Sequence, residues 1–253
     1  MDETKSSFFA RVGAKASFYM GLGSGIGGIF VIGFFLLVGM YFKGGTFAFA
    51  GNNPSLAGNQ VADTGQPGAP APISFEMQKN EWVRGDKNAK VAMVTFSDTE
   101  CPFCKRFHST MQQVMNDYNG KVKWVYRNFP LAQLHQYATK EAEALECAGD
   151  LGGNDVFWKY LDRMMELTQS NDGLPPQQLP EIATFVGLNK AKFESCLSSG
   201  KFAKKVQDNI QAAVAAGGTG TPYNLVIAGD QKIPVNGAVP IEQLKAILDP
   251  LVK

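Results

Sequence analysis

Apolar and polar positions divide this chain of 253 residues into three regions. Residues 18–42 contain no charged side chain and are largely apolar, residues 43–72 are poor in large apolar side chains, and residues 73–253 mix both kinds. A helix over the first region would be about 37 Å long at about 1.5 Å per residue, enough to cross a hydrocarbon core of about 30 Å. The pattern therefore predicts a transmembrane anchor at 18–42, a linker at 43–72 and one folded domain at 73–253, after a tail at 1–17.

Positive charges around the apolar run indicate its orientation. Lys5, Arg11 and Lys15 precede it, whereas only Lys43 follows closely. Because positively charged flanks stay in the cytoplasm, we expect a cytoplasmic N-terminus, a single pass through the cell membrane and an extracytoplasmic domain. Residues 48–50 (Ala-Phe-Ala) also fit a signal-peptide cleavage site, so cleavage is an alternative, and either interpretation exports the domain.

The composition of the linker indicates its flexibility, and the overall charge bears on the possible partners. Residues 51–72 are rich in Gly, Pro, Asn and Ala, and such a segment cannot bury enough apolar surface to offset the entropy lost on ordering. We therefore expect a flexible tether. The formal net charge of +1 provides no basic stripe for a phosphate backbone, which argues against a nucleic-acid partner.

The first part of the folded domain has the pattern of a β-α-β unit. Residues 90–97 are a nearly continuous apolar run with β-forming side chains, as in a strand that is buried on both faces. After Pro102, apolar residues recur at steps of three and four up to Tyr118, which predicts a helix that ends near 119–120. A second strand is expected over 122–126.

The rest of the domain has the pattern of several helices, then a β-hairpin and one more helix. The helices are expected at 134–148, 156–167, 175–186, from Asn189 past Leu197, and at 202–216. The hairpin is expected at 223–228 and 232–235, and the last helix begins at Pro240. The layout predicts an α/β fold in which an all-helical insertion at about 131–216 separates a βαβ half from a ββα half.

Cys101 and Cys104, separated by Pro102 and Phe103, stand at the predicted start of the helix that follows the first strand. Unpaired backbone N–H groups and the positive end of the helix dipole stabilise a thiolate at such a position. Cys101 is therefore the expected nucleophile, open to solvent, and Cys104 is the thiol that resolves a mixed disulfide. A zinc half-site is the competing interpretation, but zinc needs a second close pair of ligands, which the sequence lacks.

Neighbouring residues could adjust the chemistry of this pair. Pro102 and Phe103 lie between the cysteines and Glu100 immediately precedes them, so all three are candidates for tuning the redox properties. His108, one helical turn after Cys104, could shuttle a proton or complete a copper site. The simpler interpretation places His108 on a solvated face.

Two further cysteines, Cys147 and Cys196, lie in separate predicted helices of the insertion. In an oxidising compartment two such cysteines usually pair, so we expect a structural Cys147–Cys196 disulfide. Two buried free thiols are the alternative.

Three stretches resemble the DsbA-like family of thiol:disulfide oxidoreductases, especially its membrane-anchored members similar to BdbD. They are FSDTECPFCKRFH at 96–108, RNFPL with a following His and EALECA within 127–148, and GTGTPYNLVI at 218–227. The resemblance runs from about Glu81 to the C-terminus and implies a thioredoxin fold with an all-helical insertion. It also implies that Thr221-Pro222 is a cis-proline loop beside the cysteines, where the Thr221 backbone pairs with an extended substrate peptide.

The same resemblance implies an enzyme that introduces disulfides into exported proteins with free thiols, without a cofactor or a bound metal. A quinone-linked membrane protein, similar to DsbB or to a vitamin K epoxide reductase homologue, would reoxidise it. Pro102-Phe103 departs from the Pro-His of the best-known oxidases, so a reductase or isomerase of the same fold is an alternative. The other alternative is a non-enzymatic copper-binding or scaffold module.

Overall fold

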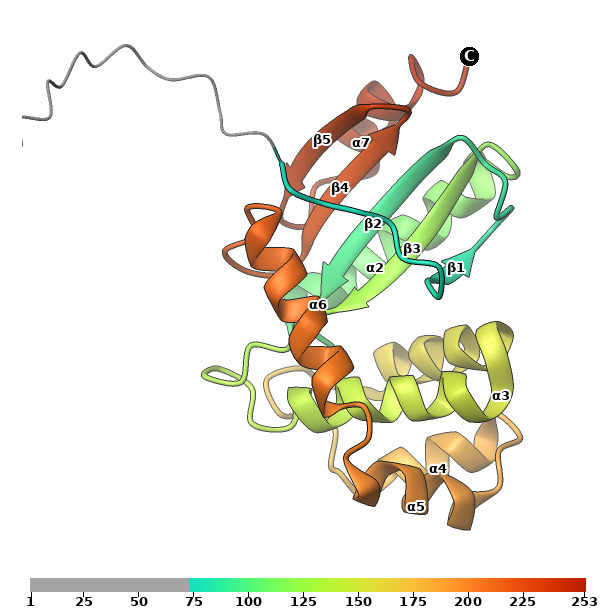
Figure 1. Cartoon of the computed structure of the whole chain (residues 1–253), viewed down its shortest axis with the longest axis vertical. Coiled ribbons are helices and arrows are strands. Elements are labelled where there is room, and N and C mark those ends of the chain that lie inside the picture. The colour runs from blue at the N-terminus through green and yellow to red at the C-terminus, as the bar shows by residue number, and fades with distance from the viewer. Residues whose placement is uncertain (1–72) are drawn as a thin grey trace, which may run out of the picture. The chain divides into compact units, whose positions relative to one another are not determined.

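The computed structural model of this chain describes residues 73–253 (Figure 1). The predicted tail, transmembrane anchor and linker over residues 1–72 lie outside the described residues. Within 73–253 no helix combines the length and the apolar character needed to cross a bilayer. The helices and strands, in chain order, are β1 (Trp82–Arg84), β2 (Val91–Ser97), α2 (Pro102–Asp117), β3 (Val122–Asn128), α3 (Ala138–Leu167), α4 (Gln178–Phe185), α5 (Lys190–Ser199), α6 (Ala203–Ala215), β4 (Tyr223–Ala228), β5 (Gln231–Asn236) and α7 (Ile241–Leu248).

The strands form one mixed sheet in the order β1-β3-β2-β4-β5. β2 lies at the centre, parallel to β3 and antiparallel to β4, so Val94 is paired with Val125 on one side and with Leu225 on the other. All seven residues of β2 are buried, as its continuous apolar run predicts. The sequence pattern does not predict β1, because its three half-buried residues are too few to show an alternation.

Two apolar clusters cover the two faces of the sheet. Met93 belongs to one cluster and Val94 and Phe96 belong to the other, because successive side chains of a strand point to opposite faces. α2 packs on the Met93 face through Phe107 and Met111, and α7 joins it there, whereas α6 covers the opposite face (Figure 1). The start of α2 is thereby fixed at the end of the central strand.

Helices α3 to α6 form an all-helical insertion between β3 and β4 (Figure 1). The two helices that the sequence predicts at 134–148 and 156–167 both lie in α3, where Gly153, with a non-helical φ of 78° and ψ of −173°, separates them at a kink. The predicted helix start at Leu134 is wrong, because residues 131–137 form turns and Leu134 is exposed. In this loop the polar side chain of His135 turns inward, 2.9 Å from Asp98, which apolar spacing alone does not reveal.

A buried carboxylate joins the insertion to the sheet. Glu146 of α3 accepts hydrogen bonds from the Trp82 indole and the Asn128 amide, both at 2.9 Å, and pairs with Lys205 Nζ at 2.5 Å. These partners belong to β1, β3 and α6, so the carboxylate is not left uncompensated inside the protein. The insertion is thereby held against the edge of the sheet.

Candidate active site

Cys101 and Cys104 lie where β2 is followed by α2. Cys101 occupies the N-cap position of α2, and Pro102 begins the helix, where its missing N–H removes no helical hydrogen bond. The first-turn N–H groups have no partner inside the helix, and the positive end of the helix dipole lies at this position. Both thiols are free in this structure.

The two cysteines differ in acidity. The Cys104 thiol, which donates to the Cys101 sulfur, lowers the pKa of Cys101 to about 6 against the effect of burial, with further help from backbone N–H groups and the Thr221 side chain. Burial raises the pKa of Cys104 well above its usual range, and Cys101 reinforces this shift. At neutral pH an ionised Cys101 therefore lies beside a protonated Cys104.

Little of either cysteine reaches the solvent. Cys101 is 5% exposed and Cys104 is 1% exposed. The expectation of an open nucleophile is wrong for this structure, because Thr221 packs against Cys101 and its carbonyl oxygen lies 3.5 Å from Cys101 Sγ. Cys101 is still the more accessible of the two cysteines, so a second molecule reaches Cys101 first.

The Thr221–Pro222 peptide bond is cis and directly precedes β4. The Pro222 carbonyl accepts a hydrogen bond of 2.9 Å from the N–H of Gly237, which follows β5, so the loop is anchored to the end of the hairpin. The Thr221 hydroxyl is buried and has no hydrogen-bond partner among residues 73–253. Thus the structure brings together the two segments that the sequence resemblance singles out.

Pro102 and Phe103 form an apolar rim next to the nucleophile. Both are exposed, and Phe103 retains 54% of its accessible area. The Arg106 guanidinium lies 5.1 Å from the centroid of the Phe103 ring, which leaves one face of the phenyl group for other contacts. The rim is therefore suited to apolar side chains of an approaching polypeptide.

Glu100 is fully buried and its carboxylate is held by the loop that follows α3. Its oxygens accept hydrogen bonds from the Thr168 hydroxyl at 3.2 Å and from the N–H groups of Gly173 at 2.9 Å and Leu174 at 3.0 Å. Residues 170–172 of this loop all have positive φ, between 52° and 65°, an uncommon conformation that precedes the two donor N–H groups. Glu100 thereby ties the turn before Cys101 to the helical insertion.

A second buried carboxyl group, that of Glu141 in α3, lies close to Glu100. The Thr99 hydroxyl donates to it at 2.5 Å. Burial and then the Glu100 carboxylate raise the pKa of Glu141 to about 9, although the Thr99 hydroxyl acts in the opposite direction. Glu141 is therefore protonated at neutral pH, as expected where two carboxyl groups meet away from water.

Asp98 connects both cysteines to the loop before α3. Its N–H donates to Cys104 Sγ at 3.5 Å, and its carbonyl oxygen accepts the N–H of Cys101 at 3.2 Å. Its carboxylate lies 2.9 Å from His135 Nδ1. One residue thus contacts both members of the reactive pair through its backbone and His135 through its side chain.

His108 is buried between α2 and α3, and the expectation of a solvated histidine is wrong. Its Nε2 lies 2.8 Å from Asp162, which also pairs with Arg84 at 2.6 Å. Burial lowers the pKa of His108, partly offset by Asp162. Within the described residues no three His, Cys, Asp or Glu side chains converge as ligands for a metal ion.

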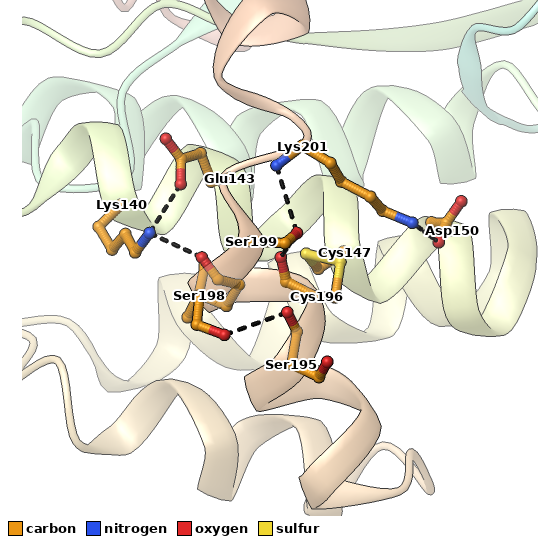
Figure 2. Close-up of a disulfide and its surroundings, with 10 residues drawn as sticks. Lys140, Glu143, Cys147, Asp150, Ser195, Cys196, Ser198, Ser199 and Lys201 are labelled. Atoms are coloured by element: carbon orange, nitrogen blue, oxygen red, sulfur yellow. Dashed lines mark hydrogen bonds and ion pairs between the residues drawn. A yellow bond between two sulfur atoms is a disulfide. The ribbon is translucent and has the colours of Figure 1, made fainter.

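Cys147 and Cys196 are joined by a disulfide that links α3 to α5, with their Cα atoms 5.9 Å apart (Figure 2). Lys140 of α3 links the same two helices, because its Nζ donates to the Leu197 carbonyl of α5 at 2.8 Å, and it also donates to Glu143 within α3 at 2.8 Å. The disulfide therefore lies inside the helical insertion, among contacts that hold its helices together.

Comparisons with known proteins agree with this geometry. The sequence model of the family described as Thioredoxin matches residues 77–250. The chain belongs to the thioredoxin family. Among solved structures, DsbA2 of Pseudomonas aeruginosa is 25% identical with a TM-score of 0.60, and the match covers 70% of this chain and 96% of that one. Oxidised BdbD of Bacillus subtilis is 23% identical with a TM-score of 0.61, and the match covers 71% and 97%. The DsbA-like thioredoxin fold with a helical insertion is confirmed.

Curated relatives are much longer than this chain. A protein named Na(+)/H(+) antiporter NhaA 3, from Salinispora tropica, is 31% identical over 164 residues, which are 65% of this chain and 24% of that protein. Na(+)/H(+) antiporter NhaA 1 of Mycobacterium sp. (strain KMS) is 27% identical over 184 residues, which are 70% and 29% of the respective chains. The chain thus spans about a quarter of the length of these relatives.

Three residues that contact or approach the reactive pair have no role in the sequence-based prediction: Asp98, Glu141 and His135. The position of Asp98, three residues before Cys101, is a signal that could have identified it. Glu141 and His135 carry no such local signal, because only the fold brings them to the end of β2.

Proposed function

We propose that this protein is an extracytoplasmic thiol:disulfide oxidoreductase that introduces disulfides into exported proteins. The observation that carries the proposal is the unequal pair at the start of α2, in which the pKa of Cys101 is lowered to about 6 beside a buried Cys104. A thiol of low pKa leaves readily, so a disulfide that contains it is easily passed to another protein. The DsbA-like fold supports the same class of reaction.

The reaction begins with a disulfide between Cys101 and Cys104. A client thiolate attacks Cys101 Sγ, the client–Cys101 bond forms, and Cys104 leaves and takes up a proton, in keeping with its raised pKa. A second client thiolate then attacks the client sulfur of the mixed disulfide and releases Cys101 as a thiolate. Two electrons pass from the client to the enzyme, which ends with two free thiols, the state present in this structure.

The Thr221-Pro222 loop and the Pro102-Phe103 rim are the proposed client-binding elements. The Thr221 backbone lies beside the nucleophile, with its carbonyl oxygen 3.5 Å from Cys101 Sγ, so an extended peptide paired with this loop would bring its own sulfur to Cys101. The exposed ring of Phe103 offers apolar contact without reading a particular sequence. These features fit an enzyme that acts on many incompletely folded polypeptides.

The cellular setting is part of the proposal. The uncharged run at 18–42, with basic residues before it, supports a membrane anchor that places the thioredoxin-fold domain outside the cytoplasm. An enzyme that has oxidised a client must itself be reoxidised. We propose a quinone-linked membrane protein similar to DsbB or to a vitamin K epoxide reductase homologue for this step.

The proposal is tested by equilibrating the full-length chain, purified in detergent, in glutathione buffers and by following oxidation of a reduced client peptide. We expect a midpoint more oxidising than that of glutathione and client oxidation that is abolished in Cys101→Ser. Cys104→Ser keeps the nucleophile, which attacks oxidised glutathione in these buffers and releases one reduced glutathione, so the variant should accumulate a mixed disulfide with glutathione. A midpoint near about −270 mV, that of thioredoxin, would indicate a reductase instead. Undiminished oxidation by Cys101→Ser would indicate a binding module.

A further inference from the structure

Asp98 and His135 form a buried acid–base pair, and Asp98 contacts both cysteines through its backbone. Asp98 is 1% exposed and His135 is 5% exposed, and Asp98 Oδ2 lies 2.9 Å from His135 Nδ1. The same oxygen accepts the N–H of Leu131 at 2.7 Å, and Oδ1 accepts the N–H of Glu100 at 2.8 Å. Both carboxylate oxygens are therefore occupied, and the Asp98 side chain has one fixed position.

The backbone of Asp98 transmits this position to the reactive pair. Its N–H donates to Cys104 Sγ at 3.5 Å and its carbonyl oxygen accepts the N–H of Cys101 at 3.2 Å. The loop over 131–135 thus supplies two of the groups that hold Asp98, the N–H of Leu131 and the His135 ring. A change in His135 would therefore alter the position of Asp98 and, through its backbone, the surroundings of both cysteines.

The charge of the pair matters as much as its geometry. A carboxylate buried this close to Cys101 would by itself disfavour the thiolate, because like charges repel strongly where water is excluded. A protonated His135 cancels that effect. Burial lowers the pKa of His135, but the hydrogen bond to Asp98 and the negative charges of Asp98, Cys101 and Asp172 raise it overall.

We propose that His135 is a positioning residue that fixes Asp98 and, in its positively charged form, stabilises the Cys101 thiolate. A stabilised thiolate favours the reduced enzyme, so the Cys101–Cys104 disulfide becomes a stronger oxidant. The inference rests on the proposed function only to the extent that Cys101 takes part in thiol–disulfide exchange.

Other ionisable groups also face this pair. Cys101 faces it from the start of α2, and Asp172 faces it from the loop after α3. Glu141 of α3 lies close enough for the Asp98 charge to raise its pKa, and it is protonated at neutral pH. Asp172 is held by the N–H of Tyr137 at 3.1 Å. Cys101 is therefore the neighbour whose charge changes when the enzyme is oxidised.

Reciprocal coupling provides a test on the unmodified protein. The chain has two histidines, His108 and His135, so the NMR spectrum of the full-length chain with labelled histidine contains two titrating signals. The signal that is missing from the spectrum of His108→Gln belongs to His108. If His135 stabilises the thiolate, the thiolate must raise the pKa of His135 by the same factor. We expect the titration midpoint of His135 to fall by about one pH unit when the protein is oxidised, and by the same amount in Cys101→Ser, which corresponds to a tenfold coupling. The titration midpoint of His108 should stay the same. A His135 midpoint that is the same in all three forms would overturn the inference.

Variants distinguish the effect of the His135 charge from the effect of its hydrogen bond to Asp98. His135→Gln keeps a hydrogen-bonding side chain but removes the charge, and we expect about a tenfold loss in the equilibrium constant for oxidising glutathione, equivalent to about 30 mV. Asp98→Asn combined with His135→Gln removes both charges and should recover most of that loss. His108→Gln is the matched control, because it removes a buried histidine that also pairs with an aspartate, Asp162, and should leave the midpoint unchanged.

The outcomes are distinct. The role of the charge would be overturned if His135→Gln had the same redox midpoint as the wild type. It would also be overturned if the redox midpoint of the double variant were no more oxidising than that of His135→Gln. If His135→Gln does not fold, the wild-type titration decides, since it needs no substitution at His135. Client oxidation that survives in Cys101→Ser would refute the proposed function instead, and the coupling between His135 and Cys101 is measured without any client.

Discussion

Cys101 Sγ lies 3.5 Å from the carbonyl oxygen of Thr221, although 120 positions separate the two residues in the chain. The central pairing of the sheet brings them together, because β2 and β4 are antiparallel neighbours. Cys101 follows the end of β2, and Thr221 precedes the start of β4. Thr221 therefore contacts the nucleophile from outside the helix that carries it.

Replacing Thr221 by valine should weaken the acidity of the nucleophile without unfolding the protein. The buried Thr221 hydroxyl has no hydrogen-bond partner within residues 73–253 of the reduced structure, so its proton is free for the Cys101 thiolate. The Thr221 side chain helps to lower the pKa of Cys101. We expect Thr221→Val to raise that pKa, measured by thiolate absorbance in the ultraviolet, and to give a less oxidising midpoint. The free energy of unfolding in urea should change by less than about 1 kcal/mol, because an unpaired buried hydroxyl adds little stability. An unaltered pKa of Cys101 would contradict the prediction.

Alkylation of the reduced protein should modify one cysteine with a midpoint near pH 6. Only a thiolate reacts, and the pKa of Cys101 is lowered to about 6, so the rate with iodoacetamide should rise from about pH 5 and level off by about pH 7. Cys104 should not react in this range, because burial raises its pKa and leaves it 1% exposed. Mass spectrometry locates the label, and Cys101→Ser is the control that should lose the fast reaction. A midpoint above about pH 8, the range of an ordinary thiol, would argue against an activated Cys101.

The protonated Glu141 should make the fold less stable as the pH rises. The pKa of Glu141 is raised to about 9 in the folded chain, against about 4.3 in an unfolded one. Between these values the unfolded chain has released a proton that the folded chain keeps. The associated stability is fully present below about pH 4 and is lost with rising pH, by at most about 1.4 kcal/mol per pH unit.

Glu141→Gln isolates this effect, because glutamine stays neutral at every pH. The free energy of unfolding of the variant relative to the wild type should increase steadily from about pH 5 to about pH 8, as measured by urea unfolding at several pH values. A difference that does not change with pH would show that Glu141 is ionised in the folded protein.

Loss of the Cys147–Cys196 disulfide should reduce stability and leave the reactive pair intact. The bridge spans 49 positions, and closing a loop of that size stabilises by about 4 kcal/mol in the chain-entropy model. We expect the double variant Cys147→Ala/Cys196→Ala to lose about 2–4 kcal/mol in urea unfolding. The redox midpoint of the Cys101–Cys104 pair should stay the same, because the bridge joins α3 to α5 and does not touch α2. An undiminished free energy of unfolding would show that the insertion is stable without it.

The sequence by itself determined most of the local elements and the reactive pair. The apolar run of β2 and the three-and-four spacing of α2 predict their conformations because each periodicity is a property of neighbouring residues. The same spacing places Cys101 at a helix start, where the backbone stabilises a thiolate. The membrane anchor at 18–42 stays a prediction from the sequence.

Only the tertiary structure decided what surrounds the two sulfurs. Thr221 reaches Cys101 through strand pairing, and Glu141 and His135 reach the end of β2 because the insertion packs there. The same packing covers the nucleophile, which the sequence pattern predicts to be open, and it replaces the predicted helix start with the loop that carries His135. These contacts join segments far apart in the chain, and local periodicity contains no information about which distant segments will meet.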